Sequence, residues 1–143
     1  MKADFSNYDS GVKVVSEKIR DLKYNIKVLI INAGYGLFDP FTKLENNKIY
    51  NFISTMCTAY AQLSFEFNRK NKKIIFHSKS EKCLLYFTSS ALAAISSPKS
   101  ALYCDVKAYD SALASHLYVE KYGKKFGCNS NSTWFVQGFK VFR

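Results

Sequence analysis

The chain has 143 residues and a formal net charge of +10; 48% of its residues are hydrophobic and 16% are aromatic. This length suits one domain with a substantial core, and the composition excludes a disordered chain. The lysines are scattered along the sequence rather than gathered in a basic module, so we expect a solvated surface and no nucleic acid partner. No apolar run approaches the roughly 20 residues that a membrane span needs, so we also expect no membrane span.

The four cysteines lie far apart and form no C-x-x-C pair, and the two histidines stand at no zinc-like spacing from them. We therefore predict free thiols and no metal site. Free thiols suit a reducing compartment, and no apolar signal-peptide core follows the basic start. The sequence predicts a soluble, intracellular protein.

The first part of the chain predicts a helix followed by a buried strand. Met1–Phe5 is long enough only for the stub of a strand, and Ser6 or the pair Asp9–Ser10 is a candidate N-cap for the helix. The nearly continuous aliphatic run Ile26–Asn32 is typical of a strand buried on both faces of a parallel sheet. This order favours an α/β fold. The apolar stripe of the helix comprises Val12, Val15, Ile19 and Leu22.

The later part of the chain continues the alternation of helices and strands. A long amphipathic helix is predicted over Leu44–Phe67, followed by the cationic stretch Arg69–Lys73. Cys83–Thr88 reads as the next sheet strand, whereas Ile74–Phe76 is either a turn or an extra edge strand. The last predicted elements are a helix over Ser100–Tyr122, with Val106, Leu113, Leu117 and Tyr118 facing inward, and a short strand over Thr133–Val136.

Two stretches follow the predicted strands and can carry chemistry. Ala33-Gly34-Tyr35-Gly36 is either a loop where a ligand approaches the backbone or a simple turn. On a helix, Tyr103 and Lys107 share one face, and an ammonium group lowers the pKa of a neighbouring phenol. A serine of the cluster Thr88–Ser90 could hydrogen-bond the group that this phenol protonates. With ten tyrosines in the chain, one such pair is expected by chance, so a surface aromatic and a solvated lysine remain the alternative.

Together these stretches resemble the short-chain dehydrogenases/reductases. The segment Leu29–Phe41, LIINAGYGLFDPF, is similar to the corresponding segment of one branch, and Ser90 precedes Tyr103 by 13 residues, which is the family's interval. The resemblance covers Lys2 to about Val141. It implies an α/β fold, a partial Rossmann-like doubly wound parallel sheet with flanking helices, and the cofactor NAD(P).

The resemblance also implies roles. It makes Tyr103 the general acid/base, Lys107 the residue that lowers the pKa of that phenol and binds the nicotinamide ribose, and Ser90 the residue that positions a small carbonyl or alcohol substrate. It implies a homodimer through helices 44–67 and 100–122. The residues that would line the adenosine side of the cofactor are Asp4, Asn32, Ala33 and Gly34.

Several departures from the family bear on activity. The chain has no glycine-rich turn of the pattern G-x-x-x-G-x-G, Met56 stands where the family has a proton-relay asparagine, and Gln137 replaces the proline before Gly138. Asp105 lies close enough in sequence to compete for Lys107. We therefore expect a single truncated domain over residues 1–143. It would be an internal fragment without the N-terminal cofactor motif and the C-terminal substrate-binding segment, and inactive as an isolated chain. The alternative is a catalytically dead remnant that acts as a dimerisation module.

Overall fold

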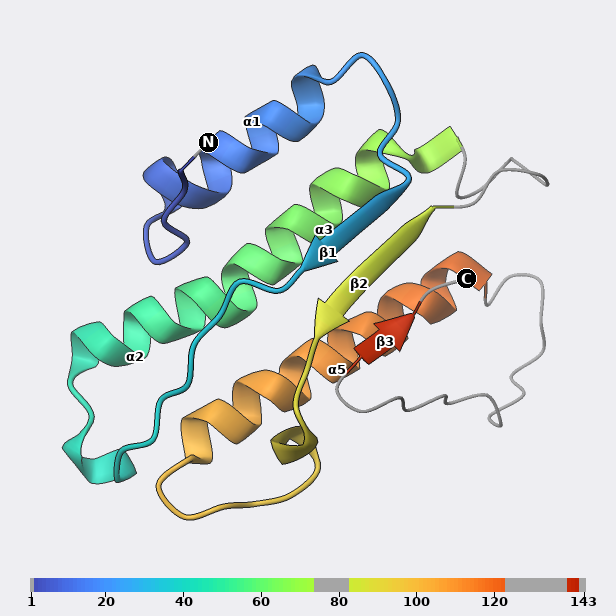
Figure 1. The fold of residues 1–143 in the computed structure, drawn as a ribbon. Helices are drawn as coiled ribbons and strands as arrows, with labels where there is room; N and C mark the ends of the chain where they lie inside the picture. The colour runs from blue at the N-terminus through green and yellow to red at the C-terminus, as the bar shows by residue number, and fades with distance from the viewer. Residues whose placement is uncertain (1, 74–82, 123–138, 142–143) are drawn as a thin grey trace.

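The computed structural model describes residues 2–73, 83–122 and 139–141 (Figure 1). The predicted strands Ile74–Phe76 and Thr133–Val136, like Gln137 and Gly138, lie outside these residues. None of the helices in the described ranges combines the length and apolar character needed to cross a membrane. In chain order the helices are the π-helical turn η1 (Tyr8–Val12), α1 (Lys13–Asp21), the 3-10 turn η2 (Phe41–Lys43), α2 (Asn46–Ile53), the π-helical turn η3 (Ser54–Thr58), α3 (Ala59–Lys70), the 3-10 turn η4 (Ala91–Ala93) and α5 (Ala101–Tyr122).

Three strands form the described sheet, in the order β1 (Val28–Ile31), β2 (Leu84–Thr88) and β3 (Phe139–Val141). β1 and β2 are parallel, with Leu29 opposite Leu85, so the parallel pairing expected of these two runs is confirmed. β3 pairs with β2 in the antiparallel sense. Figure 1 shows the strands side by side, with α3 and α5 running along them.

The core lies on one face of this sheet. Side chains alternate between the two faces of a strand, and the inward ones are Ile31 of β1 together with Leu85 and Phe87 of β2. The expectation that β1 is buried on both faces is wrong, because Val28 and Ile30 are 51% and 62% exposed. The physical reason is that α1, α3 and α5 all pack against the same face. Their contributions to that cluster are Ile19 from α1, Tyr60, Leu63 and Phe67 from α3, and Ala114 from α5.

The long helix predicted over Leu44–Phe67 is confirmed as the continuous run α2–η3–α3, which begins at Asn46 and ends at Lys70. Its cationic end has a local partner: Lys70 Nζ donates to the backbone oxygens of Arg20, at 2.9 Å, and of Leu22. These carbonyls end α1, where backbone acceptors have no helical partner. The predicted apolar face is buried at Phe52, Met56, Tyr60, Leu63 and Phe67, whereas Ile49 is half-buried and Ile53 is 38% exposed.

The start of the chain differs from the expectation. Lys2–Phe5 is not a strand, and the N-cap is Asn7, whose Oδ1 accepts from the backbone N–H of Ser10 at 3.2 Å. The chain folds back so tightly here that a Cβ on Gly11 would lie 2.0 Å from the backbone oxygen of Asp4. A glycine is therefore required for this turn to close.

Helix α5 turns charged as well as apolar residues inward. Val106 and Ala114 are buried as apolar residues, and Lys107 and Asp110 are buried beside them. Leu113 and Leu117 are half-buried against the core cluster. Tyr118, which was predicted to face inward, is 40% exposed.

Replacing Gly11 with alanine tests the tight approach of the two N-terminal segments. We expect Gly11→Ala to lower the free energy of unfolding by about 1–3 kcal/mol, because backbone atoms must move to admit the methyl group. The measurement is urea unfolding followed by circular dichroism.

Gly36→Ala is the matched control. Its Cβ would meet the ring of Phe38, an exposed side chain that can rotate away, so we expect a cost below about 1 kcal/mol. Equal costs for the two variants would contradict the proposed backbone clash.

Candidate active site

The carboxyl ends of β1 and β2 meet at one edge of the sheet, as the parallel pairing requires. Thr88 Oγ1, at the end of β2, donates to Oδ1 of Asn32, which follows β1, at 2.6 Å. Lys107 reaches the same edge from α5, because its Nζ donates to the backbone oxygen of Thr88 at 2.9 Å. The structure therefore brings together two of the predicted site residues, Asn32 and Lys107.

The Lys107 ammonium group lies inside the helix–sheet layer and forms an ion pair. Nζ contacts Oδ2 of Asp110 at 3.1 Å, and the two side chains are 5% and 0% exposed. Nζ also lies 5.6 Å from the centre of the Tyr60 ring, within range of a cation–π interaction. Oδ1 of Asp110 has no hydrogen-bond partner among the described residues. Asp110 is thus a fully buried carboxylate with one oxygen committed to Lys107.

Asp110 is the residue that the sequence interpretation missed. It expected Asp105 to compete for Lys107, but Asp105 is exposed and the pair forms with Asp110 instead. The reason is helix geometry: residues three apart share a helix face, whereas residues two apart do not. The spacing of Lys107 and Asp110 was a signal that could have been used.

Burial dominates the electrostatics around this pair. It raises the pKa of Asp110 to about 7, although the Lys107 ammonium and its hydrogen bond act in the opposite direction. Burial, followed by the Asp110 carboxylate, raises the pKa of the Cys57 thiol to about 11. The same two causes raise the pKa of the Tyr60 phenol. The thiol and the phenol therefore stay neutral at neutral pH.

Tyr103 lies among aromatic rings. Its ring centre is 5.2 Å from that of Phe38 and 6.4 Å from that of Phe52. The side chain is half-buried, and its phenol oxygen makes no hydrogen bond to any residue that the structure describes. Tyr103 and Lys107 share α5, but the contacts of the ammonium group are with Thr88 and Asp110. The geometry thus leaves the phenol group available to a ligand.

The two serines after β2 have different surroundings. Ser90 is the N-cap of η4, and its Oγ accepts from the backbone N–H of Leu92 at 3.2 Å. Ser89 is tied to α5, since its Oγ donates to the backbone oxygen of Lys107 at 3.1 Å and lies 2.8 Å from Oγ of Ser111. Ser89 therefore anchors the helix, whereas Ser90 keeps a hydroxyl proton to donate.

The loop after β1 is packed tightly against the long helix. A Cβ on Gly34 would lie 2.7 Å from Sδ of Met56, which is fully buried. The backbone oxygen of Ala33 accepts from the Tyr60 hydroxyl at 3.3 Å. The Met56 side chain thus fills space beside Gly34 as part of the core.

The Asp4 side chain is exposed in the N-terminal segment. Its carboxylate accepts from the backbone N–H of Ser6 at 3.0 Å and from the Ser6 hydroxyl at 2.8 Å, and these bonds lower its pKa. The pKa of Tyr35 is raised by burial and then by the charge of Asp4. Asp4 therefore acts electrostatically on the loop that contains Ala33 and Gly34.

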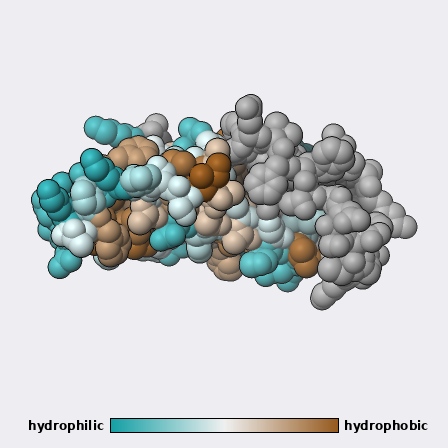
Figure 2. Space-filling model, turned by 90° about the horizontal axis from the view of Figure 1, so that it is seen from below, coloured by the Kyte–Doolittle hydropathy of each residue, from teal (hydrophilic) through white to brown (hydrophobic). Residues whose placement is uncertain are grey.

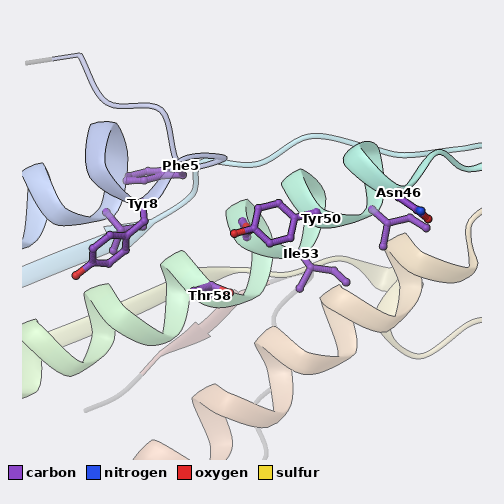
Figure 3. A pocket seen from close by; sticks show the side chains of 9 residues that line it. Phe5, Tyr8, Asn46, Tyr50, Ile53 and Thr58 are labelled. Atoms are coloured by element: carbon purple, nitrogen blue, oxygen red, sulfur yellow. The ribbon is translucent and has the colours of Figure 1, made fainter.

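A cavity of about 360 Å³ lies elsewhere, between the N-terminal segment and the long helix. In Figure 3, Phe5 and Tyr8 approach it from one side and Tyr50 and Ile53 from the other. None of the predicted catalytic residues lines it. In the described ranges no three His, Cys, Asp or Glu side chains are grouped to hold a metal ion.

No protein-family model matches the sequence, and no curated protein matches it significantly. Solved structures with the same fold do match. A short-chain dehydrogenase from Sphingobium yanoikuyae in complex with NADPH has a TM-score of 0.73 and 19% identity, covering 85% of this chain and 44% of that chain. A bulky-bulky ketone specific alcohol dehydrogenase from Comamonas testosteroni has a TM-score of 0.74 and 20% identity, and the match covers 87% of this chain and 46% of that chain. An alcohol dehydrogenase from the archaeon Thermococcus sibiricus, complexed with 5-hydroxy-NADP, has a TM-score of 0.69 and 22% identity. That match covers 83% of this chain and 47% of that chain.

The chain has the α/β, Rossmann-like fold of the short-chain dehydrogenases, over less than half the length of these structures. The fold predicted from the sequence is confirmed.

The buried pair predicts how stability depends on pH. Because the pKa of Asp110 is raised to about 7 from an ordinary value of 3.8, the folded chain binds more protons than the unfolded chain between these values. We therefore expect the contribution of this group to the free energy of unfolding to fall as the pH rises through that window. Asp110→Asn should remove this dependence, measured by urea unfolding at a series of pH values.

Val106→Ala is the control, since it opens a cavity one turn away on the same helix without removing a titratable group. It should lower stability at every pH by a similar amount. An unchanged pH dependence in Asp110→Asn would show that another group is responsible.

Proposed function

We propose that the chain carries the catalytic half of an NAD(P)-dependent oxidoreductase site that interconverts a carbonyl and an alcohol. The observation that carries this proposal is the meeting of Asn32, Thr88 and Lys107 at the carboxyl edge of a sheet with the short-chain dehydrogenase fold. Open α/β sheets bind ligands beyond this edge. Each of the three solved structures described above is named as a dehydrogenase, and two of their names include a nicotinamide cofactor or its derivative.

The residues at this edge can contact the nicotinamide ribose and the adenosine side of such a cofactor, but not its pyrophosphate. Lys107 Nζ donates to two acceptors and has a third N–H group for a ribose hydroxyl. Asn32, Ala33 and Gly34 are exposed and can line the adenosine side, and Asp4 is exposed nearby. The sequence contains no glycine-rich turn for the pyrophosphate. We therefore assign the nicotinamide ribose to Lys107 and the adenosine side to Asn32, Ala33, Gly34 and Asp4, with no residue assigned to the pyrophosphate.

The proposed chemistry is acid–base catalysis around a hydride transfer, and bound NAD(P)H would supply the hydride. During reduction, the Tyr103 phenol would donate its proton to the carbonyl oxygen of the substrate, and the Ser90 hydroxyl would hydrogen-bond the same oxygen. Lys107 would stabilise the phenolate that remains, through its positive charge and its contact with the ribose. The half-buried position of Tyr103 among aromatic rings supports a substrate with an apolar body.

Reduced nicotinamide mononucleotide tests this assignment, because it contains the nicotinamide ribose but not the adenosine half. We expect it to shift the NMR signals of Ser90, Tyr103 and Lys107 with a dissociation constant of about 1 mM, and NADPH to bind no more than about tenfold tighter. The reason is that these 143 residues provide no pyrophosphate turn. We also expect no measurable turnover by this polypeptide alone.

Two variants sharpen the test. Lys107→Met should abolish the shifts, whereas Tyr103→Phe should leave the affinity within about twofold because it removes only a phenol oxygen. Where turnover can be measured, Tyr103→Phe should lower it by about 10²-fold or more. Shifts that survive Lys107→Met would contradict the assigned ribose contact. Micromolar NADPH binding would contradict the role given to the missing turn.

A second candidate function is that of a dimerisation module without catalysis. The observation in its favour is that large apolar side chains are exposed on the two helices concerned: Tyr50 and Phe65 on the long helix, and Tyr109, Tyr118 and Val119 on α5. On the face seen in Figure 2, however, hydrophobic residues lie among hydrophilic ones. Dimerisation itself does not decide between the two functions, because a dimer can also carry a site at the sheet edge.

Analytical ultracentrifugation tests the dimer. We expect the chain to sediment as a dimer, and Tyr118→Lys to shift it to the monomer by placing a charge in the apolar contact. Tyr24→Lys is the matched control, because Tyr24 is 68% exposed but lies between α1 and β1. A monomeric wild-type chain would contradict the module, and equal effects of both variants would contradict its location.

A further inference from the structure

We propose that Asp110 is a positioning residue for Lys107: its carboxylate fixes the ammonium group at the end of β2 so that one N–H group faces the ligand. This inference rests on the proposed function, because it concerns the lysine that would bind the nicotinamide ribose.

The argument begins with the donors of Lys107. An ammonium group has three N–H groups, and the acceptors at Thr88 O and Asp110 Oδ2 take two of them, at 2.9 and 3.1 Å. Two bonds with different directions fix both the position and the rotation of the group. The direction of the third N–H follows from the other two, and it is donated to no residue that the structure describes.

The surroundings give Lys107 no comparable alternative to Asp110. Burial raises the pKa of Asp110, and the Lys107 ammonium group is the positive charge that lowers it. Cys57 and Tyr60 face the pair from the long helix, and Tyr109 lies next to Asp110 on α5. Burial and the Asp110 charge raise the pKa of these three groups, so all are neutral at neutral pH. Without Asp110, the Thr88 carbonyl is the one hydrogen-bond acceptor that the described residues leave to the ammonium group, beside the Tyr60 ring.

Stability alone is a weak explanation for the pair. Desolvation of two charges commonly offsets their attraction, and a buried ion pair can be replaced by apolar residues without a net loss. Asp110 also keeps one oxygen unpartnered among the described residues, which adds to the cost of burying it. What the pair does provide is a fixed location for a charge that would otherwise sit on a flexible four-carbon side chain.

The test is an NMR measurement of the Lys107 side-chain nitrogen, in a chain labelled with isotope-enriched lysine and aspartate. When the pH of the wild-type chain is varied, we expect the NMR shifts of Lys107 Nζ and of the Asp110 carboxyl carbon to change with the same midpoint pH. In Asp110→Asn we expect a displaced Nζ signal. The acylation rate of Lys107, relative to the exposed Lys48, should rise about tenfold by mass spectrometry, which corresponds to about 1.4 kcal/mol of lost protection.

Val106→Ala separates positioning from general loosening, since it destabilises the same helix while both partners of the pair remain. It should leave the Nζ signal and the relative acylation rate within about twofold of the wild-type values. An Nζ signal that does not follow Asp110 in the wild-type titration would overturn the proposal even if Asp110→Asn failed to fold. So would equal effects of Asp110→Asn and Val106→Ala.

Reduced nicotinamide mononucleotide then separates this inference from the proposed function. If both are correct, the compound shifts the Nζ signal of the wild-type chain, and its affinity falls about tenfold in Asp110→Asn. If the compound does not bind the wild-type chain but the Nζ signal still follows Asp110, the proposed function fails and the positioning role stands. If it binds both chains equally well, the positioning role has no bearing on the ligand and is overturned.

Discussion

The ammonium group of Lys107 joins helix α5 to the end of strand β2, and much of the site depends on this contact. It donates to the Thr88 backbone oxygen, while the Thr88 hydroxyl donates to Asn32 at the end of β1. The Ser89 hydroxyl returns a bond to the backbone oxygen of Lys107. Helix and strands are thus held in register by polar bonds at the edge where ligands of α/β folds bind. From within the layer, the Asp110 carboxylate forms an ion pair with the same ammonium group.

The apolar core between the sheet and the helices supports the same geometry. Leu85 and Phe87 of β2 pack with Tyr60 and Phe67 of α3, which places the long helix along the sheet. Tyr60 connects the two systems, because its ring centre lies 5.8 Å from that of Phe87 while its hydroxyl donates to the backbone oxygen of Ala33 in the loop after β1. One side chain therefore relates the core to the loop proposed to line the cofactor.

The sequence predicted the parts of this structure that depend on local pattern. The aliphatic run around Val28 and the amphipathic period of the long helix set their elements to within a few residues, since burial of an apolar face dominates both. The interval from Ser90 to Tyr103 and Lys107 could also be counted in the sequence, and in the structure it spans the 3-10 turn η4, a loop and the start of α5.

The sequence could not predict features that depend on which elements share a face. The run around Val28 reads as buried on both sides, yet α1, α3 and α5 lie on one side and leave Ile30 exposed. The N-cap is another case: several polar residues near Asp9 could serve, and the backbone path past Gly11 selects Asn7. Such choices are made by packing rather than by composition.

Met56 on the long helix and Asp110 on α5 are both fully buried, and Asp110, unlike Met56, forms an ion pair with Lys107. A relay asparagine would bring a polar amide to the position where the fully buried Met56 thioether now packs against Gly34. A thioether cannot donate a hydrogen bond, so the long helix offers no polar group there to orient Lys107. The carboxylate that contacts Lys107 comes from α5 itself, one turn beyond the lysine. The ammonium group of Lys107 is therefore bonded to its own helix and to β2.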